Sequence, residues 1–97
     1  MLRITSQRQS DTVVLRLEGR LQGPWVDELS ECWQRTREAS NDAAFRIELV
    51  DVCFVDTAGK ALLTQMHRAG VDILATGVLT TAIRDEIVGA RRRRLTR

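Results

Sequence analysis

The sequence predicts an α/β domain in which a four-stranded mixed sheet carries its helices on one face. Residues 12–18 and 45–50 alternate apolar with charged side chains, which is the period of a strand with one face buried and one in water. Segments with the apolar spacing of helices lie between and after these strands. Helical connections make the later strands parallel, and an opening hairpin adds one antiparallel strand at the N-terminal edge. The charged outward positions leave the other face for the helices.

The strands at the two ends of the pattern follow the same alternation. We predict the first strand at residues 2–7, with Leu2 and Ile4 inward, and a turn near residues 9–11 that leads into the second strand. The last strand is predicted at residues 71–76, where Val71, Ile73 and Ala75 point inward. The predicted order is therefore strand, strand, helix, strand, helix, strand, helix.

The first helix begins at Gly23-Pro24, because proline at the first helical position loses no hydrogen bond. A helical stripe of mostly apolar residues then faces the sheet: Trp25, Val26, Leu29, Cys32, Trp33 and Thr36.

The second helix is predicted from about Thr57 to Ala69 and stops at Gly70, a residue suited to the left-handed position after a helix. We expect its buried stripe to be Ala58, Ala61, Leu62, Gln65, Met66 and Ala69. The third helix is expected to begin at Thr80 or Thr81, to bury Ile83 and Ile87, and to run into a series of arginines.

The length of 97 residues suits one domain, which we place at residues 1–90, with a basic C-terminal tail at residues 91–97. The tail holds five arginines, so removing it changes the net charge from +2 to −3. An arginine run can contact nucleic acid or anionic lipid, but at a terminus it is more often a solvated end. Because the rest of the chain is acidic, we expect no direct binding of nucleic acid.

Composition gives no support for an enzyme, a metal site or a cofactor. Cys32 and Cys53 lie 21 positions apart without a further cysteine or histidine at ligand spacing, and His67 is the single histidine. No nucleophile–base pair or phosphate-cradling glycine loop is recognisable. Without a long apolar segment, we expect a cytoplasmic protein that does not insert into membranes.

The segment from Phe45 to Gly59 carries the most specific signal. Its strand leads through a short apolar turn into Asp56-Thr57-Ala58-Gly59, which resembles the signature of the STAS family, also called anti-sigma factor antagonists. The run Leu17-Glu18-Gly19-Arg20-Leu21 resembles the same family's exit from its second strand, and the similarity of order and length extends over about residues 1–88. The resemblance implies a STAS-like fold. Ala58, Val50 and Gln22 depart from the usual family pattern.

The resemblance also implies a function. In this family a partner kinase phosphorylates the hydroxyl residue after the aspartate, which is Thr57 here, and its state selects the binding partner. The first turn of a helix favours a nearby phosphate, because free N–H groups and the helix dipole meet there. We therefore expect a kinase-type anti-sigma factor as the partner. From the residues alone, Asp56 is a helix cap and Gly59 allows close packing.

A second interpretation remains open. The run from Val55 to Leu63 also resembles the small cytoplasmic STAS subunit of Mla-type lipid-transport ABC systems, which binds the ATPase subunit and uses the corresponding threonine as a contact. Under either interpretation we expect an exposed strip on the second helix to contact the partner, while the sequence leaves homodimerisation open. The expected partner-binding residues are Asp56, Thr57, Gly59, Lys60, Leu63, Thr64 and His67.

Overall fold

The computed structural model describes residues 1–40 and 43–95. The order of elements is the predicted one: β1 (Leu2–Gln9), β2 (Thr12–Leu21), α1 (Pro24–Ala39), β3 (Ala44–Val55), α2 (Thr57–Arg68), β4 (Asp72–Ala75) and α3 (Val78–Leu95). The sheet order is β1-β2-β3-β4; β1 is antiparallel to β2, and the other pairs are parallel. The four-stranded mixed sheet is thus confirmed, although β2 and β3 extend further than predicted.

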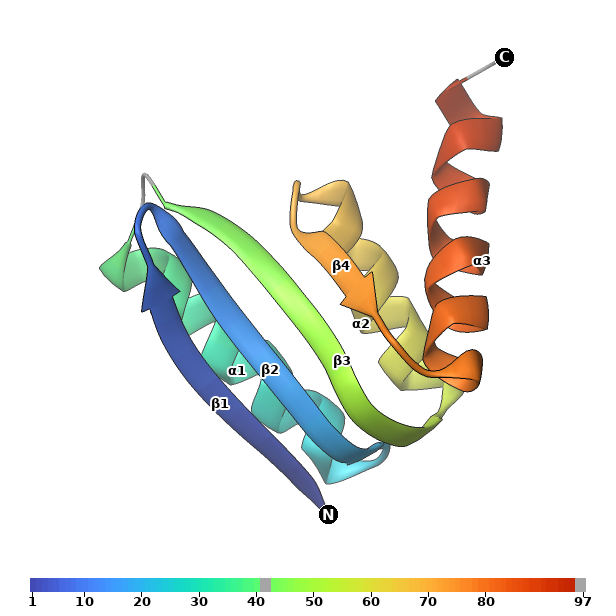
Figure 1. The fold of residues 1–97 in the computed structure, drawn as a ribbon, viewed down its shortest axis with the longest axis horizontal. Coiled ribbons are helices and arrows are strands. Elements are labelled where there is room, and N and C mark those ends of the chain that lie inside the picture. Colours follow the sequence, from blue (N-terminus) through green and yellow to red (C-terminus); the bar gives the residue numbers. More distant parts are fainter. Residues whose placement is uncertain (41–42, 96–97) are drawn as a thin grey trace.

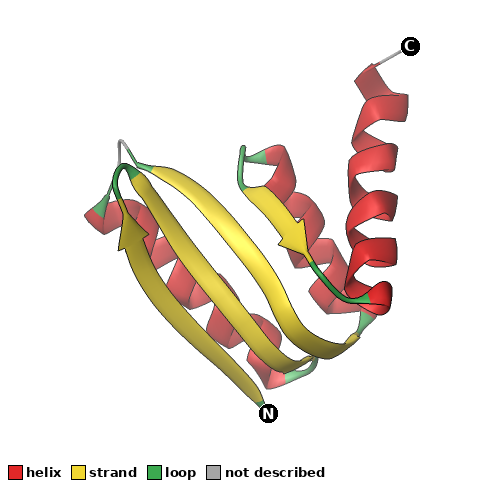
Figure 2. Cartoon of the chain, in the orientation of Figure 1, coloured by secondary structure: helices red, strands yellow, loops and turns green. Residues whose placement is uncertain are grey.

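One face of the sheet is covered by helices. Figure 1 shows α1 behind β1 and β2, α2 behind β3 and β4, and α3 beside α2 beyond the β4 edge. The same layers are seen by element type in Figure 2. The strands bury their alternate apolar residues against this layer, and Ile83 and Ile87 of α3 join the same core, as predicted. The buried residues of α1 are Val26, Leu29 and Trp33.

The opposite face of the sheet is charged, as the alternation predicts. Arg16 on β2 contacts Glu48 on β3 at 3.3 Å, and Arg46 on β3 lies 3.6 Å from Asp72 on β4. Val14 lies on this face as well, and yet only 1% of it is exposed. The aliphatic stems of the neighbouring arginines can shield such a residue while their charged ends stay in water.

The predicted orientation of α2 is wrong. Leu62 and Met66 are buried as predicted, together with Gly59 and Leu63, whereas the other four predicted core positions are exposed: Ala58, Ala61, Gln65 and Ala69. Leu63, expected on the surface, is 0% exposed. The helix is turned so that its glycine and its large apolar residues face the sheet. This orientation buries both adjacent leucines, which removes more apolar surface from water than the predicted one.

Gly59 allows α2 to lie close to the end of β2. A Cβ at this position would stand 2.9 Å from the Leu21 carbonyl oxygen and 2.9 Å from Cγ1 of Val55, closer than such atoms are found in folded proteins. Gly19 has a similar role on β2, where a Cβ would clash with the carbonyl oxygen of Met1. Two glycines thus set the packing at the carboxyl end of β2.

The third helix begins earlier than predicted, at Val78 instead of Thr80 or Thr81. Thr80 is instead a buried residue of the first turn, and its Oγ1 accepts a hydrogen bond from the Gly77 N–H at 3.0 Å. Helix α3 continues through the arginines to Leu95, while the side chains from residue 90 onward lie outside the described part of the chain. The division between a domain at residues 1–90 and a tail at residues 91–97 stays a prediction.

The orientation of α2 can be tested by a pair of leucine truncations. Leu63→Ala should lower the free energy of unfolding by about 2 to 5 kcal/mol, because it leaves a cavity in the core. Leu74→Ala is the matched control, since Leu74 is 45% exposed on the open face of the sheet, and should change stability by less than about 0.5 kcal/mol. Urea denaturation followed by circular dichroism measures both. Equal effects would contradict the orientation described here.

Candidate functional site

The candidate site lies at the carboxyl end of the parallel strands. Figure 1 shows that all three helices begin at this end of the sheet. Leu21 and Val55 are paired neighbours at the ends of β2 and β3, so the residues that follow them also meet. The main-chain N–H of Asp56 donates to the Leu21 carbonyl at 3.1 Å. The first turn of α2 is therefore placed directly beside the loop that leads into α1.

Asp56 joins the beginnings of two helices. Its Oδ1 accepts a hydrogen bond from the Gly59 N–H at 2.7 Å, which makes it the N-cap of α2 as predicted. Its Oδ2 accepts from the N–H of Gly23 at 3.0 Å, and Gly23 is the N-cap residue of α1. One carboxylate thus satisfies donors on both sides of the site. The bond to Gly23 was missed from the sequence, although the adjacency of parallel strand ends is the signal that could have found it.

Thr57 is the first residue of α2, and its side chain is exposed. A hydroxyl here is accessible to another protein and lies beside the free N–H groups of the first helical turn. Phosphorylation of Thr57 itself stays a prediction.

Lys60 is half-buried and forms an ion pair with Glu86 on α3 at 3.2 Å. This contact ties the first turn of α2 to α3 on the flank of the site. Glu86 could not be identified from the sequence, because nothing in the local pattern relates two residues 26 positions apart.

The remaining predicted contact residues separate into two groups. Thr64 and His67 are half-buried along α2, and Thr64 Oγ1 donates to the Lys60 carbonyl at 2.8 Å. Leu63 and Gly59 are buried, so the side of the helix that holds them is not open to a partner. Leu63 as a contact residue is therefore a wrong prediction, caused by the wrong orientation of α2. The outward face of α2 instead begins at Thr57 and continues through Ala61, Thr64, Gln65 and Arg68.

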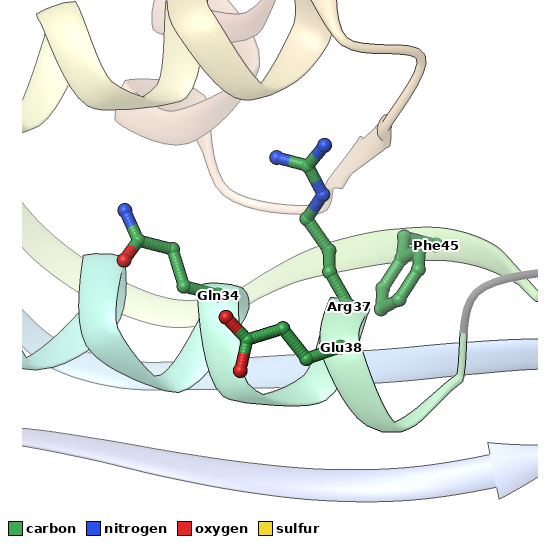
Figure 3. A pocket seen from close by; sticks show the side chains of 4 residues that line it. All are labelled: Gln34, Arg37, Glu38 and Phe45. Atoms are coloured by element: carbon green, nitrogen blue, oxygen red, sulfur yellow. The ribbon is translucent and has the colours of Figure 1, made fainter.

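A surface groove of about 440 Å³ lies elsewhere and does not belong to this site. Figure 3 shows its lining residues, three from the C-terminal half of α1 and one from the start of β3: Gln34, Arg37, Glu38 and Phe45. Arg37 is 14 residues from Gly23, or about 21 Å along the helix. Its guanidinium stacks over the Trp33 ring at 4.8 Å from the ring centre. The groove contains no arrangement of acid, base and nucleophile among these lining residues.

The described residues were compared with the requirements of a metal site and of a membrane-spanning helix. Among residues 1–40 and 43–95, no group of three or more histidine, cysteine, aspartate or glutamate side chains is arranged to hold a metal ion. No helix in the described part of the chain combines the length and the apolar character needed to cross a bilayer.

Comparison with solved protein structures identifies the fold. An anti-sigma factor antagonist from Mycobacterium paratuberculosis superposes with a TM-score of 0.78 and 16% sequence identity, over 95% of this chain and 81% of that one. This chain has the fold of an anti-sigma factor antagonist. An uncharacterized protein of the DUF3478 family from Shewanella loihica, with a SpoIIAA-like fold, gives a TM-score of 0.55 at 14% identity, over 80% of this chain and 70% of that one.

The anti-sigma factor antagonist fold also matches part of a larger protein. The crystal structure of Mglu superposes with a TM-score of 0.59 and 18% identity, over 75% of this chain but only 19% of that chain. No family model and no curated protein sequence matches. The STAS-like fold expected from the Asp56-Thr57-Ala58-Gly59 segment is confirmed, and the likeness is one of three-dimensional structure.

The role of Asp56 can be separated into its two hydrogen bonds. Asp56→Ala removes both, and should lower the free energy of unfolding by about 2 kcal/mol. Asp56→Asn keeps the Oδ1 acceptor for Gly59 but presents an amide to Gly23, and should cost about 1 kcal/mol. Asp51→Ala, at an exposed carboxylate, is the control and should be neutral. Thermal and urea unfolding measure all three; a neutral Asp56→Ala would contradict the bridging role.

Proposed function

We propose that this domain is a regulatory protein-binding module that acts as an anti-sigma factor antagonist. The observation that carries the proposal is the exposed hydroxyl of Thr57 at the first position of α2, next to a capping aspartate, in a fold shared with an anti-sigma factor antagonist. The partner is a kinase-type anti-sigma factor, and the domain works in the cytoplasm. Phosphorylation of Thr57 releases or redirects it, so the domain controls transcription indirectly.

The position of Thr57 explains how a phosphate would change binding without unfolding the domain. Phosphorylation adds about −1.5 to −2 units of charge, and the N-terminus of a helix stabilises a nearby anion. The side chain is exposed to solvent, so the added group displaces no core residue. The charge is therefore placed on the contact surface itself, where it repels an acidic partner or blocks an apolar one.

The contact surface is the outward face of α2. Its middle strip consists of Thr57, Ala61, Thr64, Gln65 and Arg68. Lys60 and His67 lie on the flank toward α3. Gly59 is buried and shapes the surface without contacting the partner, whereas Asp56 caps α2 and is half-buried at the edge of the surface, where a partner can reach it. Two small residues, Ala58 and Ala61, are exposed at its N-terminal half and leave room for a partner's side chains to approach the helix.

The proposal is tested with substitutions at Thr57. Thr57→Glu should weaken binding to a purified anti-sigma factor kinase from the same organism at least about tenfold, as expected for a charge at the centre of an interface. Thr57→Ala should bind but incorporate no phosphate in a kinase assay, while Thr57→Ser should restore incorporation. Isothermal titration calorimetry measures the affinities, and mass spectrometry locates the phosphate.

A matched control adds the same charge elsewhere: Gln34→Glu lies in the C-terminal half of α1 and should bind as wild type does. Phosphate found at another residue, or equal binding by Thr57→Glu, would contradict the proposal. Binding of the chain to a transporter ATPase subunit, and to no anti-sigma factor, would favour the lipid-transport role instead.

A further inference from the structure

A shallow groove of about 260 Å³ runs between β1 and α1 along the free edge of the sheet. Figure 1 shows β1 at this edge with α1 behind it. Ile4, Trp25 and Cys32 line the groove and are only partly buried against the core. The charged residues of the groove are Glu28 and Arg35, both exposed. The groove therefore has an apolar floor and one charge of each sign on its rim.

The strand beside the groove has an open hydrogen-bonding edge. Within the described residues β1 pairs with β2 alone, over its full eight residues. It contains no proline, and each main-chain N–H and C=O on its outer edge can pair with another strand. The other edge of the sheet is different. There β4 has four residues, and the Ile73 carbonyl accepts a hydrogen bond from Arg84 Nε of α3 at 2.9 Å.

The charges along the groove of one chain are complementary to those along the same groove of a second copy of the chain. The residues of α1 that line the groove recur at positions 25, 28, 32 and 35, which forms one stripe along the helix. When two such helices lie antiparallel about a two-fold axis, Glu28 of each faces Arg35 of the other. Both pairs are of opposite charge. A surface that matches itself in this way is the requirement for a symmetric dimer.

Antiparallel pairing of β1 with β1 of the second copy is compatible with the same two-fold axis. Facing residues of antiparallel strands share a side of the sheet, so a two-fold axis must place one residue opposite its own copy. With Thr5 on the axis, Ile4 faces Ser6 and Arg3 faces Gln7, and no like charges oppose each other. Thr5 lies about 10 Å from the start of β1, and the midpoint between Glu28 and Arg35 about 11 Å from the start of α1. Both elements begin at the same end of the sheet (Figure 1).

We infer that two copies of this chain form a homodimer through the β1 edge and the adjoining flank of α1. The two sheets join into one of eight strands, and the apolar floors of the two grooves meet across the axis. The outward face of α2, with Thr57, stays uncovered, because α2 packs behind the opposite half of the sheet. The dimer is independent of the proposed function and would present two partner-binding surfaces.

The test exchanges the charges of the groove. Sedimentation velocity of the wild-type chain at increasing concentration should show a reversible monomer–dimer equilibrium. Glu28→Arg places arginines opposite each other, and Arg35→Glu places glutamates together. Each single variant should therefore weaken the dimer at least about tenfold. Circular dichroism should show both folded as wild type, since both side chains are exposed. Glu31→Arg, an exposed charge on α1 outside the groove lining, is the control and should dimerise normally.

Mixing the two single variants gives the decisive measurement. In a mixed dimer the two arginines on the rim of one chain face the two glutamates on the rim of the other, so the mixture should recover the affinity that each variant lacks alone. The double variant Glu28→Arg/Arg35→Glu should recover it as well. A wild-type chain that stays monomeric at its highest soluble concentration overturns the inference. So does a dimer that the single variants leave unchanged, because it would use another face.

Discussion

The carboxylate of Asp56 is the interaction on which the arrangement of the candidate site depends. It accepts hydrogen bonds from the Gly59 N–H in the first turn of α2 and from the N–H of Gly23, the N-cap residue of α1. A charged acceptor between two helix starts satisfies donors that would otherwise need water, and it meets the positive ends of two helix dipoles. The loop after β2 and the first turn of α2 are consequently fixed relative to each other. Thr57 is therefore held in the first turn of a helix that this carboxylate caps.

Most of the architecture could be predicted, because strand alternation is a strong signal where one face is charged. Residues 12–18 and 45–50 identified the two central strands, and Pro24 and Gly70 marked helix boundaries that the structure confirms to within two residues. The end of β3 was missed. Pairing with β2 shifts register near Val50 and Asp51, so the apolar pattern changes sides there and the strand continues to Val55. Alternation alone cannot follow a strand through such an irregularity.

The candidate site was predicted less completely, for two physical reasons. Helix α2 contains adjacent leucines and several small residues, so two helical orientations bury similar patterns and the sequence does not discriminate between them. The close approach of Gly59 to Leu21 decides the orientation, and that is a tertiary contact. The partners of Asp56 and Lys60 are likewise far away in sequence, at Gly23 and Glu86. The Asp56-Thr57-Ala58-Gly59 motif indicated where the site lies, whereas the residues that contact it could be identified only from the three-dimensional fold.

The two edges of the sheet differ in a way that limits how the chain can assemble. Strand addition propagates into a fibre when both edges of a sheet accept a further strand. Here β4 is short, and Arg84 already occupies the Ile73 carbonyl beside α3. Growth by edge pairing can therefore begin at β1, whereas the second edge offers only a short strand with one carbonyl already occupied. Such an assembly is closed after two copies, which protects a small sheet protein against polymerisation at high concentration.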